Sequence, residues 1–175
     1  DSVLSAIHMA YFLNQREKKQ DYIPVIAGNI NSETEYISSK FNIQIPEILK
    51  DATGKKLFLV DHNEATQRVN GSQSENIVGF VDHHKVKFEC PSPIEIHAMP
   101  WGSTNTIIYD LFLKEQIPIP EKIKQGILCA ILSDTVILKS PTTTQIDRKV
   151  VEMLSNELKI DFQKLGMELF KAKSN

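Results

Sequence analysis

Two short segments of this chain place an aspartate and a histidine directly after a run of apolar residues. Asp82-His83-His84 follows the apolar run 77–81, and Asp61-His62 follows the apolar run 57–60. Carboxylates and imidazoles are costly to bury unless they are paired or hold a metal ion. The repeated pattern therefore indicates a site that binds a metal, rather than a chance placement of polar residues.

Further carboxylates can join these residues. Asp134 follows the apolar stretch 127–132, and Asp1 stands where the first predicted helix begins. Aspartates and histidines without cysteine suit Mn²⁺, Mg²⁺, Co²⁺, iron or Zn²⁺. Several aspartates around one imidazole favour two ions, because a bridging carboxylate serves both. Two-metal sites clamp the attacking and leaving oxygens of an in-line displacement, which points to hydrolysis of a phosphoryl group.

Plainer interpretations exist for each residue taken alone. A single Asp after a strand is more often a turn or cap residue than a ligand. Adjacent residues in an extended chain point opposite ways, so we expect one of His83 and His84 to face the metal and the other to face the substrate. Segments 101–104 and 140–144 read as helix caps that could also line the site or hold a phosphate. We expect His8 and His97 to be structural or exposed.

The elements that position these residues alternate between helix and strand, which predicts an α/β fold. Strands are expected at 22–26, 57–60 and 77–81, with an edge strand at 94–96. Continuous apolar strands are typical of a doubly wound, mostly parallel sheet with helices on both faces, and its ligands gather at the carboxyl ends of the strands. Helices are expected at 2–19, 32–41 (with Ser32 and Glu35 as a capping box), 103–114, 121–132, 144–156 and 161–171. Because such a fold normally opens on a strand, the helix at the start leads us to expect a first strand upstream.

Composition excludes several classes of protein. The chain has 175 residues, of which 41% are hydrophobic and 24% charged, with a net charge of −2. These values suit one globular domain and indicate no general attraction to nucleic acid or to a membrane. The two cysteines show no disulfide or metal-binding spacing, which favours a cytoplasmic protein. Neither the P-loop pattern nor the glycine fingerprint of dinucleotide-binding domains occurs.

Three motifs of the chain, taken in order, resemble those of a known superfamily. Asp61-His62-Asn63-Glu64, Val81-Asp82-His83-His84 and Ser133-Asp134 with Lys139-Ser140-Pro141-Thr142 are similar to the successive motifs of the DHH phosphoesterases. Among these, the pattern most resembles family II, or manganese-dependent, inorganic pyrophosphatases. The resemblance implies an inorganic diphosphatase that hydrolyses pyrophosphate to two phosphates with a metal-bridging hydroxide. It also implies two Mn²⁺ (or Co²⁺) ions per site, Mg²⁺ with the substrate, and allows a homodimer.

The same resemblance implies a role for each site residue. Asp61 and Asp134 would bridge the two metals, and His83 would complete one metal's shell together with Asp1. His84 would contact the phosphate or leaving group. Asp82 would act in catalysis by orienting a neighbouring histidine.

The family pattern extends beyond both ends of this chain. An upstream His and Asp ligate the other metal in that family, and a second, carboxyl-terminal domain grips the substrate. We therefore expect residues 1–170 to form the DHH catalytic domain and residues 171–175 to begin a linker to a further domain. These residues alone are expected to show little turnover.

Two other functions stay open. Another DHH phosphoesterase would cleave oligonucleotides, cyclic dinucleotides or polyphosphate. A non-catalytic module that senses a metal or a nucleotide would keep the fold and lose ligands, and the presence of Asp61, His83 and Asp134 disfavours it.

Overall fold

The computed structural model describes residues 2–175. The predicted ligand role of Asp1 therefore lies outside the described residues. Among residues 2–175, no helix combines the length and the apolar character needed to cross a bilayer.

All strand pairings in the described chain are parallel, which confirms the predicted α/β architecture. One sheet pairs β1 (Val25–Ile26) with β2 (Glu47–Ile48). The other has the order β3-β4-β5, with β3 at Leu57–Val60, β4 at Ile77–Asp82 and β5 at Glu95–Ala98. In the register of the second sheet, Val60 lies opposite Val81. The two Asp-His motifs therefore leave the sheet side by side.

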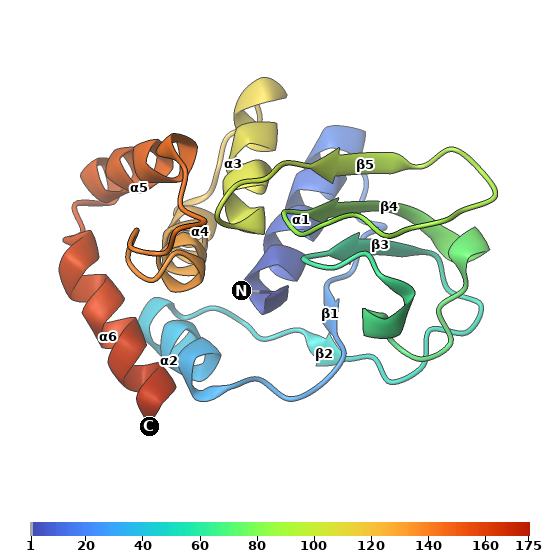
Figure 1. Cartoon of the computed structure of the whole chain (residues 1–175), viewed down its shortest axis with the longest axis horizontal. Helices are drawn as coiled ribbons and strands as arrows, with labels where there is room; N and C mark the ends of the chain where they lie inside the picture. The colour runs from blue at the N-terminus through green and yellow to red at the C-terminus, as the bar shows by residue number, and fades with distance from the viewer. Residues whose placement is uncertain (1) are drawn as a thin grey trace.

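Within residues 2–175, six α-helices accompany the strands (Figure 1). They are α1 (Ser2–Glu17), α2 (Ser32–Phe41), α3 (Thr104–Lys114), α4 (Glu121–Asp134), α5 (Gln145–Leu158) and α6 (Phe162–Ser174). Helices α1 and α3 pack against each other and against the β3-β4-β5 sheet, while α4 lies among α1, α3, α5 and α6. The main core lies between these helices and includes Phe12, Phe112, Ile127 and Ile131, all fully buried.

The opposite face of the β3-β4-β5 sheet has a smaller core. Leu59, Ile77 and Phe80 are buried there, with Phe88 and Ile94 packed against them. The rings of Phe80 and Phe88 lie 5.3 Å apart between centroids. The loop between β4 and β5 thus covers apolar surface of this face.

Several local predictions need correction. The predicted strand 22–26 is paired only at Val25–Ile26, because the side chain of Asn14 binds both the N–H and the carbonyl of Tyr22. Helix α2 is capped by Asn31, which accepts from the Thr34 N–H, and not by Ser32. Helix α6 continues through Ser174, so residues 171–174 are helical. The division of the chain into domain and linker stays a prediction.

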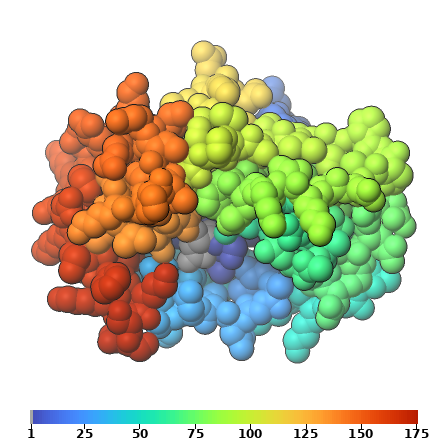
Figure 2. Space-filling view, in the orientation of Figure 1, coloured from blue at the N-terminus to red at the C-terminus, as the bar shows by residue number. Residues whose placement is uncertain are grey.

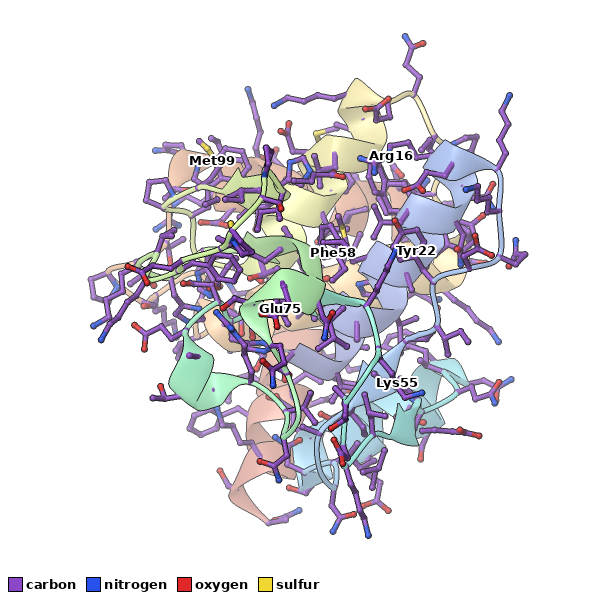
Figure 3. All side chains as sticks on the ribbon, turned by 90° about the vertical axis from the view of Figure 1, so that its right-hand side faces the viewer. Arg16, Tyr22, Lys55, Phe58, Glu75 and Met99 are labelled. Atoms are coloured by element: carbon purple, nitrogen blue, oxygen red, sulfur yellow. The ribbon has the colours of Figure 1, made fainter. Side chains whose placement is uncertain are left out.

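An apolar groove of about 530 Å³ lies between the two sheets. Met9 and Leu13 of α1 line it, together with residues of β1 and β3. Tyr22 and Phe58, which also line the groove, are labelled on the face of the molecule shown in Figure 3. Within the described chain β1 and β3 do not pair with each other, so the groove separates the sheets.

An ion pair between Arg16 and Glu95 joins the end of α1 to the edge strand β5. Arg16 donates from Nη1 to Glu95 Oε2 at 2.6 Å and from Nη2 to Glu95 Oε1 at 2.8 Å. His97, on the same face of β5, contacts Glu95 Oε2 at 2.5 Å. The hydrogen bonds from Arg16, opposed by burial and aided by His97, lower the pKa of Glu95 to about 2.

Replacing Glu95 by Gln is therefore expected to destabilise the fold in a pH-dependent way. Because the pKa of Glu95 is lower in the folded chain than in the unfolded chain, its ionised carboxylate stabilises the native state at a pH above the unfolded-state pKa. This contribution is lost as the pH falls through the folded-state pKa. After allowance for solvent screening, we expect a loss of about 1 to 2 kcal/mol at pH 7 that shrinks by more than half at pH 3. Urea unfolding at both pH values measures it, with the exposed Glu75→Gln as control. An equal loss at both pH values would contradict this account.

Candidate metal centre

Three side chains converge at the carboxyl ends of β3 and β4. The potential ligand atoms of Asp61, His83 and His84 all lie within 4.8 Å of one another. His83 Nε2 is 3.5 Å from Asp61 Oδ1, and His84 Nδ1 is 3.9 Å from the same oxygen. These strand ends face the helical part of the molecule (Figure 1). Figure 2 shows a hollow in the surface between the strand-rich part and the helices.

Asp61 reaches the other residues through an unusual backbone conformation. Its φ is 62°, in the left-handed region, and its N–H donates to the Val81 carbonyl at 2.9 Å. For a residue other than glycine this conformation costs on the order of 1 kcal/mol, although Asp and Asn tolerate it better than most. The chain thus turns sharply at the end of β3 while Asp61 stays bonded to β4.

His83 is held in one orientation by a backbone carbonyl. Its Nδ1 donates to the Trp101 carbonyl at 2.8 Å, so Nε2, the nitrogen that faces Asp61, is the one that can offer a lone pair to an ion when the ring is neutral. A metal-binding histidine is commonly fixed in this way through its second nitrogen. Burial lowers the pKa of His83, but Asp61, the Trp101 carbonyl and the charge of Asp134 outweigh this effect, so the net shift is upward.

His84 lies beside His83 and differs from it in its surroundings. Its side chain is 55% exposed, and its Nδ1 contacts Asp82 Oδ1 at 2.6 Å. Because an ionised carboxylate only accepts, this Nδ1 is the donor and has no lone pair for an ion. Among the three clustered residues, Asp61 and His83 therefore present the better ligand atoms in this arrangement.

Asp82 is fully buried beneath this cluster. Its Oδ1 accepts from the ring and the N–H of His84, and its Oδ2 accepts from Asn63 Nδ2 at 2.8 Å. Asn63 in turn binds the Lys85 carbonyl and the Lys87 N–H, so it fixes the loop that follows β4. A buried carboxylate with these partners orients His84 and is itself unavailable to an ion.

Asp134 approaches the site from the last residue of α4. Its Oδ2 accepts from the Ser103 hydroxyl at 2.5 Å. Thr104, which follows Ser103 in the chain, donates to Asp61 Oδ1 at 2.9 Å. Asp134 is not one of the three tightly clustered residues, but its charge acts on His83. The structure thus brings Asp61, His83, His84 and Asp82 into direct contact and links Asp134 to them through Ser103 and Thr104.

The electrostatics of the site favour a cation. Burial raises the pKa of Asp61, but the nearby His83 and the hydrogen bond from Thr104 act against it, and the net shift of the pKa is downward. Asp61 is therefore ionised near neutral pH. A carboxylate set with one aligned imidazole nitrogen suits a divalent ion such as Mn²⁺, Co²⁺ or Zn²⁺.

Three supporting contacts escaped the reasoning from sequence. The Trp101 carbonyl and the Asn63 side chain were not predicted to hold the motif histidines or Asp82. Segment 101–104 was read as a helix cap that could also line the site, and it was not predicted to bond two of the site's aspartates. The signal available was the run of four polar residues, Ser103–Thr106, directly before the apolar residues Ile107 and Ile108. Segment 140–144 caps α5 through Thr144, as predicted.

Comparison with known proteins agrees with this geometry. Residues 1–132 match the model of the DHH family, N-terminal domain. The chain is 44% identical to a manganese-dependent inorganic pyrophosphatase of Methanothrix thermoacetophila, a match that covers 100% of this chain and 56% of that protein. It is 39% identical to a protein of the same name from Methanocaldococcus jannaschii, over 99% of this chain and 57% of that one.

A solved structure is also similar. A crystal structure from Methanococcus jannaschii, whose name assigns it to the family II inorganic pyrophosphatases, superposes with a TM-score of 0.89 at 37% identity. The match covers 98% of this chain and 56% of that one. The chain thus spans little more than half the length of the relatives it matches. With the family model covering most of its length and the Asp-His motifs meeting at one sheet edge, the chain belongs to the DHH family.

Proposed function

We propose that the protein carrying this chain hydrolyses inorganic pyrophosphate to two phosphates with the help of divalent manganese. The observation that carries the proposal is the meeting of Asp61 with the aligned Nε2 of His83 at the carboxyl ends of two parallel strands. Two relatives match this chain over 99% to 100% of its length, and both are named manganese-dependent inorganic pyrophosphatases. These names support both the proposed substrate and the proposed metal.

The proposed ligands are Asp61, His83 and Asp134, together with Asp1, which lies outside the described residues. Two Mn²⁺ ions held by these residues would lower the pKa of a nearby water and offset the negative charge of the phosphate oxygens. Trp101 keeps His83 Nε2 directed at Asp61, so the imidazole needs no rearrangement to serve as a ligand. Substrate would arrive as its Mg²⁺ complex.

His84 is the proposed contact to the substrate. Because Asp82 accepts the hydrogen bond from Nδ1, Nε2 is the ring nitrogen left to face the substrate, and the imidazolium form of the ring would donate from it to a phosphate or leaving-group oxygen. The ring is more than half exposed, which leaves room for a small anion beside the metal centre. Asp82 acts through His84: it fixes the tautomer and the ring direction, as a buried carboxylate does in other histidine sites.

We also propose a cytoplasmic location. Both cysteines are free thiols, Cys90 at the surface and Cys129 in the core. An exposed free thiol favours a reducing compartment.

Phosphate release tests the proposed reaction. The purified protein carrying this chain is incubated with Mn²⁺ and, in parallel, with pyrophosphate, polyphosphate or a cyclic dinucleotide. We expect release from pyrophosphate that stops when EDTA removes the metal. Cleavage of the dinucleotide or of polyphosphate without hydrolysis of pyrophosphate would refute the proposed substrate and favour another DHH phosphoesterase. Tight Mn²⁺ binding with no hydrolysis of any of the three would favour a sensing module.

A further inference from the structure

Four consecutive polar residues at the start of α3 are completely buried. Ser103, Thr104, Asn105 and Thr106 are each 0% exposed. Buried polar side chains are costly unless they are hydrogen-bonded. Each of the four is bonded to a different part of the molecule, so this turn connects elements far apart in the sequence.

The first two residues of the turn hold two site aspartates. Thr104 donates to Asp61 Oδ1 at 2.9 Å, at the end of β3. Ser103 donates to Asp134 Oδ2 at 2.5 Å, at the end of α4. Because the two donors are adjacent in one helical turn, the spacing between the two carboxylates follows the geometry of α3.

The other two residues anchor the turn away from the site. Asn105 Oδ1 accepts from His8 Nδ1 at 2.6 Å, which ties α3 to α1. Thr106 donates to Asp147 Oδ1 at 2.6 Å, which ties α3 to α5. The Asp147 Oδ2 atom also accepts from the Gly102 N–H at 2.8 Å, so the residues on both sides of Ser103 and Thr104 are fixed.

From this arrangement we infer that Thr104, with Ser103 beside it, is a positioning residue for the metal centre. The inference rests on the proposed role of Asp61 and Asp134 as metal ligands. Each hydroxyl occupies one lone-pair direction of a carboxylate oxygen and thereby sets the directions left for metal ions. Together the two hydroxyls hold ligands from β3 and α4 at a fixed separation before any ion binds, in the way that outer-shell groups orient metal ligands.

A purely structural role makes a different prediction. Thr104 and Thr106 share the residue type, the helical turn, the complete burial and a carboxylate partner. They differ in that Asp61 lies among the clustered site residues, while Asp147 is a fully buried residue of α5 that also caps that helix. If the hydroxyls serve only to satisfy buried groups, both substitutions should act through stability alone.

The test compares Thr104→Val with Thr106→Val in the protein carrying this chain. Mn²⁺ affinity is measured by competition with a chelating dye, and the stability of the metal-free protein by urea unfolding in EDTA. We expect Thr104→Val to weaken Mn²⁺ binding about 10- to 100-fold. Thr104→Ser, which keeps the donor, should restore affinity to within about threefold. Thr106→Val should lower stability and change Mn²⁺ affinity far less than Thr104→Val does.

A further variant keeps the comparison usable if Thr106→Val fails to fold. Ser155→Ala removes another buried hydroxyl, one that donates to the Val151 carbonyl within α5, and serves as the second control. Wild-type Mn²⁺ affinity in Thr104→Val would overturn the positioning role. So would an equal loss of affinity in the control.

The outcome is independent of the proposed reaction. Thr104-dependent Mn²⁺ binding without hydrolysis of pyrophosphate would refute the proposed function alone. Hydrolysis of pyrophosphate with Mn²⁺ affinity that does not depend on Thr104 would refute the positioning role alone.

Discussion

Replacing Asp61 by Asn is expected to weaken Mn²⁺ binding by at least about 100-fold and to reduce phosphate release to about 1% or less. The substitution removes the negative charge that faces His83 and keeps the size of the side chain. It also suits the backbone, because Asn adopts the left-handed conformation of residue 61 as readily as Asp. The amide oxygen can still accept from Thr104, so the fold should persist while the metal ligand is lost.

Mn²⁺ affinity and stoichiometry, measured by titration calorimetry, check this expectation alongside phosphate release. Asp110→Asn is the matched control, since it removes an aspartate that pairs with Lys114 on the surface of α3 at 2.9 Å, away from the clustered site residues. Such a pair contributes no more than about 0.5 kcal/mol to stability. Unchanged stoichiometry and affinity in the Asp61→Asn protein would show that Asp61 is not a ligand.

The convergence at this site could be predicted because it depends on regular structure. Parallel strands of similar length end at the same sheet edge, and β3 and β4 were recognisable as continuous apolar runs. Once they pair in register, Asp61 and His83 must emerge as neighbours. The segment before α3 was recognisable from its residue types as a helix cap that could line the site.

Contacts that depend on the path of single loops could not be predicted. Nothing in the residue type of Asp61 requires a left-handed φ, although that angle aims its carboxylate at His83. The orienting partner of His83 is a backbone carbonyl, that of Trp101, and any residue could supply it. Strand 22–26 was predicted too long because the competing side chain, Asn14, lies in the preceding helix. In each case a tertiary contact overrides the local pattern.

Acid is expected to destabilise the fold through His8, a buried residue of α1 that bonds Asn105 of α3. His8 is 1% exposed. Its Nε2 packs so closely against Gly126 of α4 that any side chain at position 126 would overlap the ring. Burial lowers the pKa of His8 to about 4, with a partial offset from its hydrogen bond to Asn105. The unfolded chain binds a proton near the ordinary pKa of 6.5, and the folded chain does so only near 4. Stability is therefore complete above pH 6.5 and falls between pH 6.5 and pH 4, by about 3 kcal/mol from this residue.

His8→Gln isolates this contribution, because the amide can still donate to Asn105 but does not titrate. The raised pKa of His83 acts in the opposite direction, so the quantity to follow is the difference between wild type and variant in EDTA. We expect His8→Gln to be the less stable protein at pH 7.5 from altered packing, and to gain about 2 to 3 kcal/mol relative to wild type by pH 4.5. Urea unfolding at the two pH values measures that change. A difference that stays constant with pH would mean that His8 is protonated equally in the folded and unfolded chains, which the burial of its side chain opposes.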